Sequence, residues 1–216
     1  MNSNIVERSK HILLEVGATP IMYLMIALSV VSVAIMIERA WFFTVVRENI
    51  EKLASALAEL LNVHDVNGAK ELVSTSKSAE AAIVAAGLRQ LGRGADAAEE
   101  AMASATALQR MRLERRLAFL GTLGNNAPFI GLLGTVIGIV RSFHELQSSS
   151  GQVSAGLMSE IGEALVSTAI GLLVALPAVA AFNLFQRLIR ARMGRATVLA
   201  HEILAFMKSD SRRLPS

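Results

Sequence analysis

Three long runs without a charged side chain constrain this chain of 216 residues more than any other feature. The runs cover residues 16–37, 117–140 and 164–186. As helices rising 1.5 Å per residue they would each reach roughly 33–36 Å, which is enough to cross the hydrocarbon core of a bilayer. Inside lipid the backbone must satisfy its own hydrogen bonds, and the runs are too long for barrel strands. The sequence therefore predicts an all-α integral membrane protein with three transmembrane helices.

The composition supports a membrane protein and argues against several other classes. Apolar residues make up 53% of the chain and the mean hydropathy is +0.48, which is high for a soluble domain. The net charge is only +3, and the basic residues cluster beside the apolar runs, so nucleic acid is not an expected partner. Without cysteine the chain has no disulfide framework and no thiolate metal site. The sequence predicts no enzyme, metal or cofactor, because it lacks a phosphate loop and a nucleophile arrangement, and its histidines are scattered: His11, His64, His144 and His201.

Lysine and arginine predict the orientation of the helices. The segments expected on the outer side carry few basic residues: Arg8, Lys10 and Arg141. The segments on the other side carry Arg39, Arg47, Arg110, Arg112, Arg115, Arg116, Arg187, Arg190, Arg192 and Arg195. By the positive-inside rule, an N-terminal segment 1–15 lies outside, together with a loop and the start of the third helix over 141–163. The same rule places the C-terminal helix and tail, residues 187–216, in the cytoplasm.

Aromatic and basic residues mark the expected membrane surfaces. Trp41, Phe42 and Phe43 predict an aromatic anchor at the inner surface, and Tyr23 is a candidate anchor at the outer one. The arginine clusters near both inner helix ends fit the same surface, where they would set topology and contact anionic headgroups. A docking rim for a partner protein is the alternative interpretation of those clusters.

The segment between the first two runs, residues 38–116, predicts a cytoplasmic helical insert. Leucines at helical spacing lie on one face and predict a bundle core: Leu53, Leu57, Leu60 and Leu61. Asn67-Gly68 predicts a turn, and residues 78–91 predict a helix that ends at Gly92-Arg93-Gly94.

The helix that follows carries a capping signal. Asp96 with Glu99 three positions later fits a capping box, with the aspartate as the cap. From there the helical pattern runs into residues 117–140 without a strong stop. We therefore expect long helices that leave the bilayer and continue into the cytoplasm.

The second and third runs are rich in small residues, whereas the first consists mainly of long and branched apolar residues, with Ser29 and Ser32 as the polar residues in its interior. The small residues recur at four-residue spacing, which is typical of closely packed membrane helices. The expected packing residues are Gly131, Gly134, Gly138, Gly171 and Ala175, with Pro128 and Pro177 as possible kinks. We expect the first helix to face lipid and the other two to face protein or a pore.

Two hydroxyls add a second interpretation of the same helices. Thr135 lies six positions before Arg141, and Thr168 lies five positions after Glu163, so in antiparallel helices both sit roughly 7–9 Å inward. At one level they can hydrogen-bond each other or, around an axis, line a polar path. Glu163 is the acidic residue that a longer third helix would bring to membrane depth; an interfacial position is its alternative. Because neither hydroxyl titrates near neutral pH, ion transport would need a titrating group from a second protein.

Two contiguous segments resemble a known family. APFIGLLGTVIGIVRSF, residues 127–143, followed by EALVSTAIGLLVALPAVAAFN, residues 163–183, is similar to the signature of the ExbB/TolQ branch of the MotA/TolQ/ExbB proton channel family. The order of the elements resembles the family over the whole chain. The resemblance implies that Thr135 and Thr168 are pore threonines, that Glu163 is the acidic residue of the third helix, and that Asn183 is a polar position near the cytoplasmic end. Ser167 departs from the pattern, where alanine is common.

The same resemblance implies a function and a set of partners. Family members are inner-membrane subunits of proton-driven motors in Gram-negative bacteria. Five copies form a ring, and two copies of an ExbD/TolR-like subunit contribute single transmembrane helices that carry the titrating aspartate. Membrane lipids and a periplasmic or outer-membrane effector are the other implied partners, and the transported ion is expected to be H⁺ rather than Na⁺.

Alternative functions remain at this point. A passive membrane scaffold without ion conduction accounts for the small-residue faces equally well. A secondary transporter is not favoured, because the chain has no internal inverted repeat and no charged residue in the three runs. A four-span flagellar stator subunit does not fit three runs. Nothing in this chain separates import energisation, envelope maintenance and gliding motility.

Overall fold

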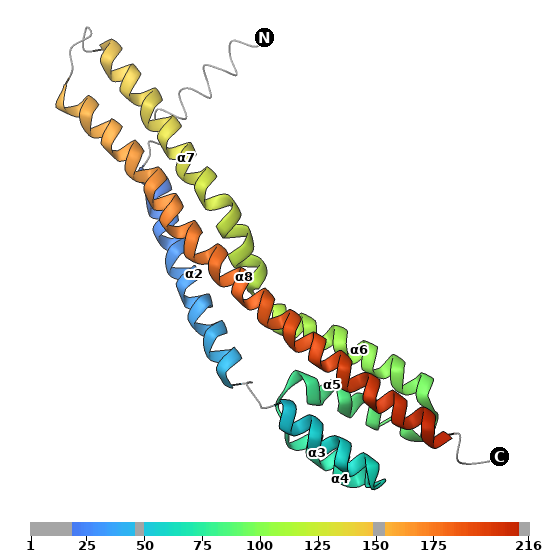
Figure 1. Cartoon of the computed structure of the whole chain (residues 1–216). Helices are drawn as coiled ribbons and strands as arrows, with labels where there is room; N and C mark the ends of the chain where they lie inside the picture. Colours follow the sequence, from blue (N-terminus) through green and yellow to red (C-terminus); the bar gives the residue numbers. More distant parts are fainter. Residues whose placement is uncertain (1–18, 46–49, 149–153, 212–216) are drawn as a thin grey trace, which may run out of the picture. The chain divides into compact units, whose positions relative to one another are not determined.

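The computed structural model describes residues 19–45, 50–148 and 154–211 (Figure 1). Several sequence expectations fall outside these ranges: the N-terminal segment 1–15, the first three residues of the first run, Arg8, Lys10, His11 and Arg47. The described part contains α2 (Thr19–Val45), α3 (Ile50–Asn62), α4 (Val66–Thr75), α5 (Ala79–Leu88), a 3₁₀ turn (Leu91–Arg93), α6 (Ala95–Glu114), α7 (Leu117–Ser148) and α8 (Ala155–Ser211). Its regular elements are all helical, which confirms the predicted fold class.

Three of these helices, α2, α7 and α8, are long and apolar enough to cross a membrane, as the three charge-free runs predict. All three extend beyond the runs. The first continues past Ile37 to Val45, the second continues past Val140 to Ser148, and the third spans 57 residues. The expectation of a third helix that continues well beyond its apolar run is confirmed. Pro128 and Pro177 both lie inside continuous helices, so neither ends its helix.

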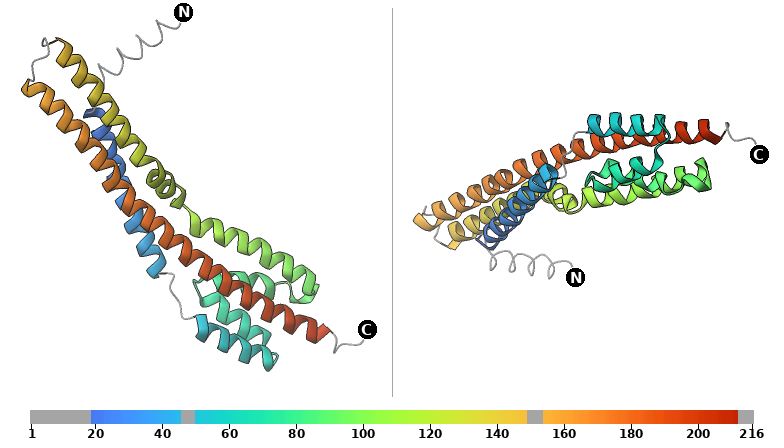
Figure 2. Two further views of the ribbon diagram at one scale, coloured as in Figure 1. Left: turned by 45° about the horizontal axis from the view of Figure 1, so that its top comes forward. Right: turned by 90° about the horizontal axis from the view of Figure 1, so that it is seen from below.

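The chain forms two compact units. Among the described residues, the membrane unit comprises 19–38, 116–148 and 154–183, and the bundle unit comprises 39–45, 50–115 and 184–211. In the membrane unit, α2, α7 and the first part of α8 lie side by side (Figure 2). Their shared core consists of Ile21, Met25, Leu123, Ala127, Ile137, Val174 and Ala175.

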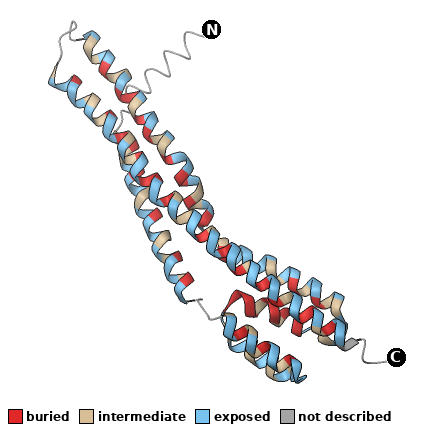
Figure 3. Ribbon diagram, in the orientation of Figure 1, coloured by how far each residue is buried: buried red, intermediate tan, exposed pale blue. Residues whose placement is uncertain are grey.

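The bundle unit has a larger apolar core, with α5 at its centre. Most residues of α5 are buried, and α5 packs against both α4 and α6 (Figure 3). Leucines of α3 predicted to share one face do so: Leu53, Leu57 and Leu61 are buried, and Leu60 is partly buried against them. The last part of α8 completes this core with Ala196, Leu199, Ile203, Leu204 and Met207. The predicted bundle core of the insert is therefore confirmed.

Two local predictions in the insert are wrong. Asn67-Gly68 lies inside α4 and forms no turn; the chain turns just before it, where His64 has a φ of 57° and Asp65 caps α4 through Gly68 N–H. Gly68 lies in the first turn of α4, where an added Cβ would collide with the side chain of the capping Asp65. Asp96 also fails as a cap, because α6 begins at Ala95 and its cap residue is Gly94, with a φ of 96° and no side-chain hydrogen bond.

The predicted continuation of the insert into the second membrane helix is also wrong. The helix α6 ends at Glu114, and α7 starts at Leu117. Between them Arg116 has a φ of 65°, which lies in the left-handed region and interrupts the helical hydrogen bonds. An ion pair with Glu38 of α2, 3.4 Å long, holds the Arg116 side chain. The break between α6 and α7 therefore depends on the backbone conformation of one residue, which the helical spacing of apolar residues does not reveal.

Candidate polar path between α7 and α8

The helices α7 and α8 contact each other through their backbones at two glycines. A Cβ atom on Gly171 would lie 2.8 Å from the Ala127 carbonyl oxygen and 3.0 Å from the Gly131 Cα. A Cβ atom on Gly131 would lie 2.9 Å from the Ser167 carbonyl oxygen. Such distances leave no room for a side chain on either helix, so both glycines serve close packing, as their spacing predicts.

The contact continues toward the C-terminal end of α7 and the N-terminal end of α8. A Cβ atom on Gly138 would meet the Ala164 methyl group at 2.5 Å, and one on Gly134 would collide with the Ser167 side chain. Ala175 is buried in the same unit. Of the two prolines, Pro128 is half-buried and Pro177 is exposed, so Pro177 does not pack against the described helices.

A pair of threonine hydroxyls bridges the two helices beside this glycine contact. The Thr168 Oγ1 atom lies 3.1 Å from the Gly131 carbonyl oxygen and 3.3 Å from Thr135 Oγ1, and its proton can go to either. The Thr135 hydroxyl donates to the Leu132 carbonyl oxygen of its own helix at 2.7 Å. The predicted matched depth is therefore confirmed as a hydroxyl–hydroxyl contact. Lone pairs remain on both oxygens and can accept a hydrogen bond from an incoming group.

Glu163 lies on a different side of α8 from Thr168 and contacts α2. The Thr19 hydroxyl of α2 donates to Glu163 Oε1 at 2.5 Å. At 100° per residue, Glu163 and Thr168 lie about 140° apart around α8, on opposite flanks of the face that contacts α7. Within one protomer the carboxylate and the threonine pair are therefore not brought together.

A further polar pair lies one turn nearer the N-terminal end of α8. Arg141 of α7 and Glu160 of α8 form an ion pair of 3.3 Å, and both side chains are largely shielded. The Ser154 hydroxyl donates to Glu145 and accepts from the Leu157 N–H, which links the C-terminal end of α7 to the N-terminal end of α8. The sequence interpretation missed Glu160 because it treated Arg141 only as a topology signal. Arg141 lies six positions from Thr135, and Glu160 lies eight positions from Thr168, so counting puts them about 9 and 12 Å from the threonine level and does not by itself single out the pair.

Two remaining predicted site residues differ in environment. Ser167 is 1% exposed, and its hydroxyl has no hydrogen-bond partner among the described residues, because it sits against Gly134. Asn183 is exposed on α8, 15 positions beyond Thr168, and so the two do not form one cluster. The serine belongs to the packed helix contact, and the asparagine stands apart.

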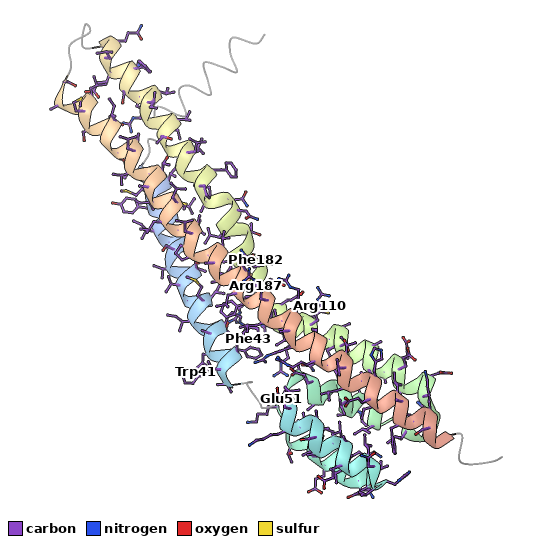
Figure 4. All side chains as sticks on the ribbon, viewed as in Figure 1. Trp41, Phe43, Glu51, Arg110, Phe182 and Arg187 are labelled. Atoms are coloured by element: carbon purple, nitrogen blue, oxygen red, sulfur yellow. The ribbon has the colours of Figure 1, made fainter. Side chains whose placement is uncertain are left out.

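The expected aromatic anchor divides between surface and core in the bundle unit. Trp41 is 73% exposed, and Phe43 is 5% exposed and stacks on Phe185 with ring centroids 5.3 Å apart. Figure 4 shows Trp41 and Phe43 on opposite sides of α2. The Arg192 guanidinium lies over the Phe43 ring and donates to the Phe43 carbonyl oxygen at 3.0 Å. Phe43 is therefore a core residue and not part of a surface anchor, and Arg192 is buried with it.

Comparison with known proteins places this geometry in a family. Residues 75–197, more than half of the chain, match the model of the MotA/TolQ/ExbB proton channel family. An ExbB-like biopolymer transport protein of Helicobacter pylori is 47% identical over 77 residues, covering 36% of this chain and 51% of the relative. The Tol-Pal system protein TolQ of Pseudomonas aeruginosa is 40% identical over 107 residues, covering 50% and 46%.

A third relative, the biopolymer transport protein ExbB of Xanthomonas campestris, is 35% identical over 114 residues, covering 53% of this chain and 45% of the relative. The chain thus spans about half the length of the curated relatives it matches. The matched family region includes both sequence segments that carry the threonine pair. With three helices fit to span a membrane, the chain is a multi-pass membrane protein that belongs to the ExbB/TolQ branch of the MotA/TolQ/ExbB proton channel family.

Proposed function

We propose that this protein is a pore-forming ring subunit of a motor driven by the proton-motive force. The observation that carries the proposal is the contact between Thr168 and Thr135, which joins α7 and α8 at one level. Paired hydroxyls can form hydrogen bonds with a titrating group without titrating themselves. They are therefore suited to line a proton route and not to act as its proton carrier.

The main titrating group comes from a second protein in this proposal. The three apolar runs contain no Asp, Lys, Arg or His. An ExbD/TolR-like partner with one transmembrane helix and an aspartate at the level of Thr135 would supply the missing carboxyl group. Two copies of that partner inside five copies of this chain is the stoichiometry that the family resemblance favours, with no catalytic residue or cofactor required of this chain.

Exposed apolar side chains support assembly with neighbours. On α7 they include Phe129, Leu132, Leu133, Val136, Ile139 and Phe143, and on α8 they include Leu165, Val166, Leu172, Leu173 and Leu176. Such surfaces need lipid or other protein around them. By contrast with α7, α2 has a much smaller buried share, 11% against 44%, which favours a lipid-facing position for α2 in the ring.

The proposed location is the inner membrane of a Gram-negative bacterium, with the N-terminus in the periplasm and the C-terminus in the cytoplasm. The distribution of lysine and arginine supports that orientation. Proton flow would drive work on the cell envelope, as import energisation, envelope maintenance or gliding motility. The effector that receives this work would be a periplasmic or outer-membrane protein.

A passive scaffold is the second candidate function, and the backbone contact at Gly131 and Gly171 is the observation that favours it. One variant tests the shared helix contact, and a second variant separates the two candidates. Gly134→Leu would collide with Ser167 and should prevent assembly under either function. Thr168→Val keeps the shape of the side chain and removes its hydroxyl, so only the motor loses activity.

The test measures assembly and energised function together in cells that express the chain with its partner. We expect Thr168→Val to assemble at the parental level and to lose energised function, because the route lacks one of its hydroxyls. Thr197→Val is the matched control, because the Thr197 hydroxyl is exposed and bonds only the Met193 carbonyl of its own helix. Normal energised function in an assembled Thr168→Val complex would favour the scaffold.

The ion is proposed to be H⁺. Hydroxyl oxygens also suit Na⁺, so the choice needs its own measurement. Activity should persist in sodium-free buffer when the proton-motive force is held constant. A requirement for Na⁺ under that condition would reverse the choice.

A further inference from the structure

The Thr19–Glu163 contact links α2 to the outer end of the proposed route. It is a short hydrogen bond between residues 144 positions apart in sequence, and it is partly buried. Glu163 is also the half-buried acidic residue next to the third apolar run. The contact therefore joins the least buried membrane helix to the carboxylate nearest the threonine level.

Two neighbouring carboxylates on α8 are held by different chemistry. Glu160 pairs with the guanidinium of Arg141, whereas Glu163 accepts from the hydroxyl of Thr19. A guanidinium only donates, so it loses the ion pair when the acid is protonated and cannot accept a hydrogen bond from the acid O–H. A hydroxyl both donates and accepts, so it can bind the acid as well, after rotation about its C–O bond.

We propose that Thr19 is a positioning residue for Glu163, which it holds in place in both protonation states. The inference rests on the proposed proton-driven function and adds a helix, α2, that the threonine pair does not involve. When Glu163 is ionised, the Thr19 hydroxyl donates a hydrogen bond to the carboxylate. When Glu163 is protonated, the Thr19 hydroxyl oxygen accepts a hydrogen bond from the carboxyl O–H. The carboxylate thus stays at the outer flank of α8 while protons arrive and leave.

The position of the contact favours this role over simple packing. A carboxylate near the bilayer interior is costly without hydrogen bonds, and one hydroxyl donor satisfies only part of its acceptor capacity. The remaining lone pairs of Glu163 are available to water or to a partner. The ion pair at Glu160 lies one turn further out, at roughly 4.5 Å along the axis, and so Glu163 follows it on the inward path.

The test compares proton flux in vesicles that contain the complete complex. Thr19→Val removes the hydroxyl and keeps the side-chain shape, and we expect flux to fall by about tenfold, equivalent to one hydrogen bond to a charged group. Thr19→Ser restores the hydroxyl donor and acceptor and should return flux to the parental level. Thr44→Val is the matched control on the same helix, because the Thr44 hydroxyl bonds only the Trp41 carbonyl.

A double-mutant comparison separates positioning from general stability. If Thr19 acts through Glu163, Thr19→Val should lower flux no further once Glu163→Ala is present. An additional tenfold loss in that background would overturn the inference. If Thr19→Val fails to assemble, Thr19→Ala, which is smaller and also lacks the hydroxyl, must show the same coupling to Glu163→Ala.

The outcomes distinguish this inference from the proposed function. Parental flux in Thr19→Val, together with lost flux in Thr168→Val, overturns the role of Thr19 alone. Parental flux in Thr168→Val overturns the proposed function, and the role of Thr19 falls with it. Failure of Thr19→Ser to restore flux in an assembled complex would also contradict the inference, since serine supplies the same donor and acceptor.

Discussion

The two units of this chain are packed by opposite means. In the bundle unit the core consists of large side chains such as Leu57, Ile83 and Ile203, each at most 2% exposed. In the membrane unit α7 and α8 meet at glycines, where a single added Cβ would lie within about 3 Å of the opposite backbone. Both are closely packed helix contacts, but the bundle core requires large side chains, whereas the contact between α7 and α8 excludes them.

The difference follows from the surrounding solvent. In water, burial of large apolar side chains stabilises a bundle at roughly 25 cal/mol per Å². In lipid the surroundings are already apolar, so helices gain little from burying leucine and associate through close backbone packing and hydrogen bonds. The close approach at Gly131 also brings Thr168 within reach of the Gly131 carbonyl oxygen and of Thr135. Packing and polar path are therefore two results of one arrangement.

The largest effect is expected from a side chain placed in the glycine contact. Gly171→Leu would drive α8 away from Gly131 and the Ala127 carbonyl, and we expect loss of the assembled complex. Gly162→Leu is the matched control on the same helix, because a Cβ at Gly162 meets nothing within 4 Å. Chromatography of the purified complex measures the outcome. Equal assembly of both variants would show that the glycine contact is not required.

In the bundle core, the damaging change is the opposite one, in which a large buried side chain is made smaller. Ile203→Ala removes a fully buried side chain and leaves a cavity, and we expect a loss of about 2–5 kcal/mol in unfolding free energy. Denaturant unfolding of the purified protein, followed by a probe in the bundle unit, measures it. Val198→Ala is the control, because Val198 on the same helix is 59% exposed. A similar loss in both variants would contradict the assignment of the core.

A smaller effect is expected at a helix cap in the bundle unit. The Ser78 hydroxyl accepts from the Ala81 N–H at 3.1 Å and caps α5. Ser78→Ala should cost about 1 kcal/mol of unfolding free energy, and Ser78→Asp should recover much of it, because aspartate also caps helices. The same denaturant experiment applies. No change in Ser78→Ala would mean that neighbouring groups already satisfy the amide.

The periodic features of the chain could be predicted from its sequence. Charge-free length gave the three membrane helices, and leucine spacing gave the core face of α3. The matched depth of Thr135 and Thr168 followed from counting residues inward from the ends of antiparallel helices. These predictions succeed because the helical repeat determines both the rise per residue and the direction in which each side chain points, over many residues.

The features that depend on one residue's backbone or on a distant partner could not be predicted. The break before α7 needs only the positive φ of Arg116, and the cap of α6 is Gly94 in place of the aspartate that the motif suggests. The contact of Thr19 joins α2 to α8, so the matched depth of the two glycine-rich helices does not predict it. Counting inward from Glu15 places Thr19 about 6 Å deep, closer to the level of Thr168 than to that of Glu163, so depth alone does not reveal the hydrogen bond between Thr19 and Glu163.

The most direct test of the central claim is proton flux through the reconstituted complex when both path hydroxyls are absent. Thr135→Val combined with Thr168→Val leaves the glycine contact intact, so the complex should assemble. Flux should fall to the level of empty vesicles when an imposed pH gradient is followed with a trapped dye, while Thr197→Val keeps the parental rate. A parental rate in the assembled double variant would contradict a proton route along Thr135 and Thr168.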